Sequence, residues 1–198
     1  MEGAGTVPIM ASPVLGQGRV TREHYWRLVD EGVIGPDDRV ELLEGVIVSM
    51  SPQNPPHAFV IAALTQWLSG AVGAEASVRV QLPLDLSELS SPEPDLAVVA
   101  GRARDYAAVH PSSALLVVEV AGGTVLQDRM TKGPMYAAAG IAEYWLVNLR
   151  ERCVEVYRRP NREQRGYTES QVLRAGDRLQ AATLAGLAIP VAEILPPV

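Results

Sequence analysis

Short apolar runs bounded by turn residues predict most of the strands in this chain. The clearest run is residues 115–120, Leu-Leu-Val-Val-Glu-Val, and it is typical of a strand that is covered on both faces of its sheet. Strict alternation of apolar and polar residues over 78–86 predicts another strand, and Pro83 favours a sheet edge or a bulge there. Further strands are expected at residues 40–50 (a hairpin around Glu44-Gly45), 95–100, 143–148 with 153–157, and 167–179 as a pair.

Helical spacing and capping residues predict the remaining elements. We expect one helix that begins at Arg22 behind the cap Thr21, one over residues 57–72, a short one within 102–110, and one that begins near Gly133 and ends at Gly140. The apolar residues 184–195 should pack across the sheet. This order of helices and strands predicts a mixed α/β (α+β) domain that is built on one central β-sheet.

Composition describes a soluble globular protein of 198 residues, 47% apolar and 20% charged. The net charge of −6 argues against a protein that coats nucleic acid non-specifically, although it leaves room for a local basic groove. Cys153 is alone, which excludes an intrachain disulfide and fits a reducing cytoplasm. Residues 1–18 match neither a signal peptide nor a membrane anchor, so we expect a flexible tail followed by a single domain over 19–198.

Several charged residues occupy positions where the pattern calls for core. Glu119 interrupts the strand at 115–120, and Asp95 opens the strand at 95–100. Buried carboxylates must be neutralised, paired with a cation or bound to a metal. If the two strands are neighbours, Asp95, Glu119 and a main-chain carbonyl form the oxygen-rich site that Mg²⁺ or Mn²⁺ prefers. Lys132, the one lysine beside sixteen arginines, is then the group that could orient or deprotonate a water, or stabilise the charge that develops on a phosphate.

Each of these residues also has a structural interpretation. Lys132 could lie on a helix surface by chance, His57 could cap or pack at the start of its helix, and Glu41 could pair with Arg39 or Arg79 across strands. Asp128 reads as a helix cap. The arginines between residues 150 and 165 are interspersed with glutamates, which favours a mixed solvated face over a phosphate-binding surface.

An ordered succession of short motifs resembles the Uma-two family of restriction-endonuclease-like proteins, in the PD-(D/E)-x-K nuclease superfamily. The motifs are Glu41-Leu42-Leu43-Glu44-Gly45, Met50-Ser51-Pro52, His57, Pro94-Asp95, Glu119-Val120, Asp128, Lys132, Tyr136-Ala137 and Glu143-Tyr144-Trp145-Leu146-Val147. The resemblance covers roughly residues 25–195. It implies a core sheet flanked by helices and Mg²⁺-dependent hydrolysis of phosphodiesters, with Asp95 and Glu119 holding the metal. Lys132 would replace the usual strand lysine, with Glu41 and His57 in support.

The chain departs from this pattern close to the expected site. The superfamily's lysine position, two residues after the strand glutamate, is Ala121, and Gly122-Gly123 replaces a Leu-Ser-Pro-Ser-Thr-like run. We therefore expect a metal-dependent endonuclease that acts on DNA, with two alternatives. One is a DNA-binding or regulatory module that has lost turnover, and the other is a metal-dependent hydrolase of another phosphoester. We expect no membrane association, and the apolar late strands and C-terminal segment could form a homodimer face.

Overall fold

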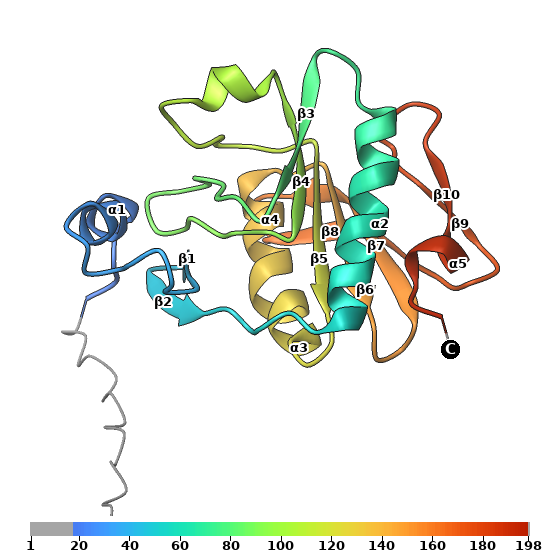
Figure 1. Cartoon of the computed structure of the whole chain (residues 1–198), viewed down its shortest axis with the longest axis horizontal. Helices are drawn as coiled ribbons and strands as arrows, with labels where there is room; N and C mark the ends of the chain where they lie inside the picture. The colour runs from blue at the N-terminus through green and yellow to red at the C-terminus, as the bar shows by residue number, and fades with distance from the viewer. Residues whose placement is uncertain (1–17, 198) are drawn as a thin grey trace, which may run out of the picture.

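The fold is organised around a six-stranded mixed sheet with the strand order β3-β4-β5-β6-β7-β8 (Figure 1). The structure is a computed structural model that describes residues 18–197, so the tail expected at 1–18 lies, except for Gly18, outside the described residues. Strands β5 and β6 are parallel and the other neighbouring pairs are antiparallel. The sheet strands are β3 Ala76–Val80, β4 Leu96–Ala100, β5 Leu116–Ala121, β6 Glu143–Asn148, β7 Cys153–Asn161 and β8 Gly166–Leu173.

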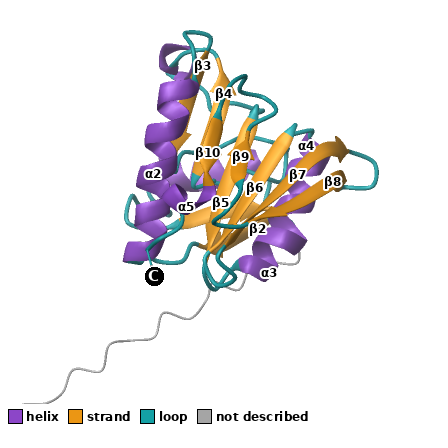
Figure 2. Ribbon diagram, turned by 90° about the vertical axis from the view of Figure 1, so that its right-hand side faces the viewer, coloured by secondary structure: helices purple, strands orange, loops and turns teal. Residues whose placement is uncertain are grey.

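Helices cover both faces of this sheet (Figure 2). One face packs against α2 (Pro55–Ala71), α5 (Val191–Ile194) and the small sheet of β9 (Arg178–Gln180) and β10 (Ala188–Pro190). The other face packs against a nearly continuous helix composed of α3 (Val125–Gln127), the π-helical turn η2 (Asp128–Lys132) and α4 (Gly133–Ala139). Because β5 is buried on both sides, its run of apolar residues is explained, and its one carboxylate must face a partner.

The N-terminal elements lie at one end of the sheet face that packs against α3, η2 and α4. Helix α1 (Arg22–Asp30) is capped by Thr21, as expected, and is followed by the hairpin of β1 (Val40–Leu43) and β2 (Val46–Ser49). Glu44, with a φ of 51°, and Gly45, with a φ of 83°, form the tight turn of the hairpin. The expected short helix after β4 is the 3₁₀ turn η1 (Ala103–Tyr106). Among residues 18–197, no helix is long and apolar enough to cross a membrane.

Two expected elements differ in the structure. The strand expected over 78–86 ends at Val80, because Gln81 has a φ of 50° and Pro83 has no N–H to donate to a ladder. The resulting β3 is an edge strand, as the proline indicated. The pair expected over 167–179 does not form either. Strand β8 pairs with β7, whereas β9 pairs with β10 from the C-terminal segment, so alternation alone did not identify the partners.

Candidate active site

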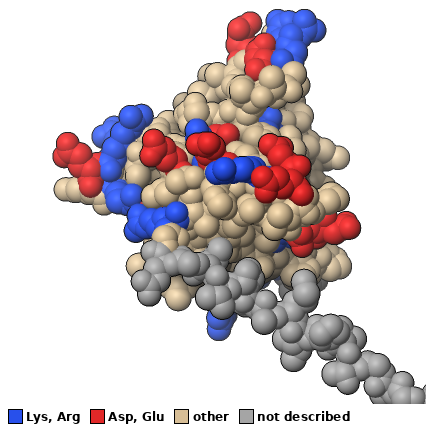
Figure 3. All heavy atoms as spheres, turned by 90° about the vertical axis from the view of Figure 1, so that its left-hand side faces the viewer, with Lys and Arg blue, Asp and Glu red and all other residues tan. Residues whose placement is uncertain are grey.

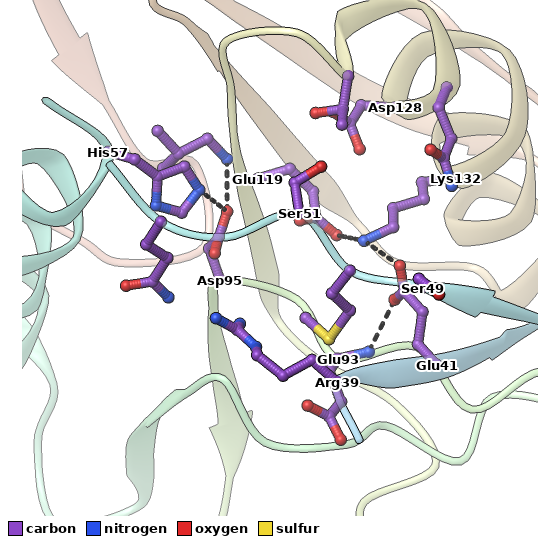
Figure 4. A pocket seen from close by; sticks show the side chains of 15 residues that line it. Arg39, Glu41, Ser49, Ser51, His57, Glu93, Asp95, Glu119, Asp128 and Lys132 are labelled. Carbon is purple, nitrogen blue, oxygen red and sulfur yellow. Dashed lines mark hydrogen bonds and ion pairs between the residues drawn. The ribbon is translucent and has the colours of Figure 1, made fainter. Parts of the chain in front are cut away.

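A polar pocket opens where β1, the start of α2, the ends of β4 and β5, and η2 converge (Figure 4). Continuing the β4–β5 register one position beyond Leu96 and Val118 brings Asp95 opposite Glu119, on the face that carries η2. Five acidic and three potentially cationic side chains contribute to the lining: Glu41, Glu93, Asp95, Glu119 and Asp128, with Arg39, His57 and Lys132.

Lys132 lies at the centre of this group. Its Nζ is 2.9 Å from Glu41 Oε1 and 3.0 Å from Glu119 Oε1, and its exposed fraction is 5%. Burial acts to lower the pKa of Lys132, but the carboxylates of Glu119 and Glu41 outweigh burial and raise that pKa well above its usual range. Lys132 is therefore an ammonium in this arrangement. The interpretation of Lys132 as a chance surface residue is wrong, and Glu41 pairs with Lys132 instead of Arg39 or Arg79.

Glu119 has a second buried partner that the sequence did not reveal. The hydroxyl of Tyr136 donates to Glu119 Oε1 at 2.6 Å, and Tyr136 is fully buried. Burial raises the pKa of Glu119 well above its usual range, and the ammonium of Lys132 opposes that rise. In the described residues, Glu119 Oε2 accepts no hydrogen bond and remains available to a ligand.

Asp95 is held from three directions. The backbone N–H of Val120 donates to its Oδ2 at 2.8 Å, and Gln81 Nε2 donates to its Oδ1 at 3.1 Å. His57 Nε2 lies 3.1 Å from Oδ2, so the side chain of His57 belongs to the site, and Asn54 is the residue that caps α2. The other ring nitrogen of His57, Nδ1, is buried and has no hydrogen-bond partner in residues 18–197.

Asp128 does not cap the N-terminus of a helix, contrary to our expectation, but lies where α3 ends and the π-helical turn begins. It begins the π-helical turn, is 4% exposed, and accepts a hydrogen bond from Thr124 Oγ1 at 2.8 Å. Its backbone carbonyl accepts the N–H of Gly133, which is the i to i+5 bond of the turn. The turn therefore directs both Asp128 and Lys132 toward the pocket, and π-turns of this kind are frequent at functional sites.

Sequence reasoning named five residues for this site, and all five lie together: Glu41, His57, Asp95, Glu119 and Lys132. It missed Tyr136, which looks like a core residue in an apolar helix, and it missed Glu93 and Arg39 at the rim. The spacing of Tyr136 four residues after Lys132, on the same face of a helix, was the signal that could have found it.

The donor chemistry of the pocket suits a hard divalent cation. Asp95 and Glu119 supply carboxylate oxygens on adjacent strands, and Val120 lines the pocket beside them. No three His, Cys, Asp or Glu side chains between residues 18 and 197 form a ready-made metal-binding group. A cation held by two carboxylates would take its other ligands from water and substrate oxygens, as Mg²⁺ usually does.

Comparison with known proteins places this chain in a nuclease family. The model of the Uma2 family, described as "Putative restriction endonuclease", matches residues 22–192. The chain belongs to the Uma2 family. The match includes every element that contributes to the pocket. No curated protein matches the chain in sequence.

A solved structure shares the fold. It is a crystal structure described as "a putative nuclease belonging to DUF820" from Anabaena variabilis, with a TM-score of 0.71 and 16% sequence identity. The similarity covers 88% of this Uma2 chain and 97% of that protein. The expected restriction-endonuclease-like fold, with helices on both sides of a mixed sheet, is thereby confirmed.

Proposed function

We propose that this Uma2 protein is a metal-dependent endonuclease that hydrolyses phosphodiester bonds in DNA. The observation that carries the proposal is a pair of carboxylates on two neighbouring strands, Asp95 and Glu119, with a buried lysine ammonium against one of them. Lys132 contacts Glu119, and Glu119 lies beside Asp95. The family to which the chain belongs supports a nucleic-acid substrate.

In this proposal Asp95 and Glu119 hold the cation, Mg²⁺ or Mn²⁺, together with the carbonyl of Val120. Such a cation supplies neutralisation of phosphate charge and a bound water of lowered pKa. Asp95 is fixed for this role by the N–H of Val120 and by His57, and Glu119 is fixed by Tyr136.

Lys132 then stabilises the negative charge that develops on the phosphate. Because its pKa is raised, its ammonium is a donor and not a general base in the resting site. Glu41 keeps this ammonium beside Glu119, because Glu41 Oε1 lies 2.9 Å from Lys132 Nζ. This arrangement explains how the chain dispenses with a lysine at Ala121.

The negative charge of the pocket implies that the cation is also needed for DNA to bind. Its lining holds five carboxylates against Arg39 and Lys132, so a phosphate that approaches the bare protein is repelled. On the face that carries α1 and the β1–β2 hairpin, acidic and basic side chains are interspersed, with no continuous basic surface (Figure 3). We therefore expect DNA binding to weaken strongly in EDTA.

The test is cleavage of supercoiled plasmid in Mg²⁺, Mn²⁺ and EDTA. Glu119→Gln, Asp95→Asn and Lys132→Met should each lower the rate by at least a hundredfold, because each removes an interaction with the reacting phosphate or its cation. Glu169→Gln, which alters an exposed residue of β8, is the matched control and should keep full activity.

Three other results would redirect the proposal. Equal cleavage by the wild type and all three site variants would assign the activity to something other than this pocket. DNA binding without cleavage in any metal would favour the binding module that Ala121 and Gly122-Gly123 suggested. Turnover of small phosphodiesters alone would favour a hydrolase of another phosphoester.

A further inference from the structure

A second buried carboxylate lies on the same face of the sheet as Glu119, two strands away. Glu119 of β5 is opposite Leu146 of β6, and Leu146 is opposite Glu155 of β7. Glu155 is 5% exposed and lies outside the pocket lining. The two carboxylates thus form a line across the sheet beneath η2.

The π-helical turn provides one cation for each carboxylate. Lys132 contacts Glu119 at 3.0 Å, while Arg129 donates to Glu155 from Nε at 2.8 Å and from Nη2 at 2.5 Å. The second contact is a two-pronged guanidinium–carboxylate pair, which fixes direction as well as distance. Two residues of one helical turn, Arg129 and Lys132, therefore join two strands through two different ion pairs.

Hydrogen bonds from two neighbouring side chains also hold Glu155 in place. Tyr157 donates to its Oε2 at 2.7 Å, and Asn148 donates to its Oε1 at 3.1 Å. Burial acts to raise the pKa of Glu155, but the hydrogen bonds from Arg129, Tyr157 and Asn148 outweigh it and hold that pKa below its usual range. Glu155 is accordingly an ionised and rigid anchor.

The anchor adds to the contacts that Lys132 and Asp128 already make, and two features of the turn make such an anchor useful. Gly122-Gly123 precedes the helix, and a π-turn is intrinsically less favourable than α-helix. Tyr144 supports it from below, with its hydroxyl 3.4 Å from the carbonyl oxygen of Asp128. If the turn relaxed to i to i+4 bonding, Lys132 would rotate about the helix axis relative to Asp128, away from its present contacts.

We propose that Arg129 is a positioning residue, whose pairing with Glu155 holds the π-helical turn in the geometry that places Lys132 between Glu41 and Glu119. Arg129 does not line the pocket, so it acts only through the turn. The expected effect of Arg129 on catalysis rests on the proposed function, whereas its effect on the position of Lys132 does not.

The chain contains a matched control for the loss of such a pair. Arg158 donates to the fully buried Glu143 from Nε at 2.8 Å, and its side chain is 27% exposed, compared with 37% for Arg129. Glu143 belongs to a different network, in which it accepts hydrogen bonds from Trp145 and from the backbone N–H of Ala182. Arg129→Gln and Arg158→Gln thus remove the same type of interaction at different places.

The test uses the single lysine as its own reporter. Protein grown with ¹³C-lysine gives one labelled side chain, so the NMR shifts of Lys132 Cε and Hε can be followed in each variant. We expect both shifts in Arg129→Gln and in Glu155→Gln to move toward free-lysine values, and those in Arg158→Gln to match the wild type. In plasmid cleavage, kcat of Arg129→Gln should fall roughly ten- to a hundredfold with KM within about twofold, since small misplacements cost this much.

The outcomes separate the two proposals. If the wild type does not cleave DNA, the proposed function fails while the lysine spectra still test the position of Lys132. An unchanged Lys132 signal in folded Arg129→Gln, or an equal fall of kcat in Arg129→Gln and Arg158→Gln, would overturn the positioning role. Glu155→Gln keeps the shape of the anchor and serves as the second variant if Arg129→Gln does not fold.

Discussion

Replacement of Lys132 by methionine tests whether the ammonium is also a structural necessity of the pocket. The substitution keeps much of the aliphatic volume and removes the charge. Glu41 and Glu119 are 3% and 4% exposed, so neither can regain water when Lys132 is lost. Two carboxylates would then face each other without a cation, and Glu119 would keep only the hydroxyl of Tyr136.

The expected loss follows from the burial of these groups. Removal of one partner from a buried ion pair costs about 3–5 kcal/mol. For a chain of this length, 1 kcal/mol corresponds to roughly 2–4 °C in melting temperature, so Lys132→Met should melt roughly 6–20 °C lower. The double variant Lys132→Met/Glu119→Gln removes one of the two stranded charges. It should recover about 1–2 kcal/mol of the loss, the scale of one relieved buried polar group.

Urea denaturation in EDTA at pH 7 measures these differences, because EDTA prevents a bound cation from replacing the ammonium. The exposed variant Glu169→Gln serves as the control and should unfold at the wild-type midpoint. A loss below about 1 kcal/mol in Lys132→Met, with no recovery in the double variant, would refute the reasoning. Such a result would mean that Glu41 and Glu119 are hydrated, or share a proton, more easily than their burial indicates.

Four further predictions concern residues outside the pocket. Burial lowers the pKa of His110 below its ordinary 6.5. The neutral imidazole therefore contributes fully to stability above pH 6.5, and this contribution is lost as the pH falls through the pKa of His110 in the folded protein. The urea midpoint should accordingly fall less between pH 8 and pH 5 in His110→Gln than in the wild type. Gly140→Ala should destabilise by about 1–2 kcal/mol in thermal unfolding, because its φ is 78° and a Cβ would meet the guanidinium of Arg162. Gly70→Ala, in α2 with open space around it, should instead stabilise by about 0.5–1 kcal/mol. Glu143→Ala should release the segment after Gln180 to limited proteolysis, since the N–H of Ala182 loses its acceptor; an unchanged digestion pattern would contradict this role.

The sequence determined those elements whose signals are local. The cap Thr21, the turn at Glu44-Gly45 and the left-handed Gly140 each depend on the conformation of a few neighbouring residues, and each appears where it was expected. Strand β5, apolar except for Glu119, was also predicted from the sequence, because a strand covered on both faces has no polar side.

Beyond the local hairpins, only the tertiary structure decided which strands pair. The partner of β9 is β10, whose residues lie beyond the apolar C-terminal loop, and alternation of side chains carries no information about such a partner. Alternation over residues 78–86 likewise predicted one continuous strand where the structure has a shorter one. The turn of backbone at Gln81 results from its contacts with Asp95 and not from its own preference.

The candidate site divides in the same way. Glu119, Asp95 and Lys132 could be found from the sequence because a charge inside an apolar pattern is costly and demands a partner. The identity of those partners came from packing, which brought Glu41 from the distant hairpin and Tyr136 from the next helix turn. The π-helical turn has no sequence signature. It forms because Glu155 and Glu119, aligned across the sheet, are bound by cations from a single turn of helix above them.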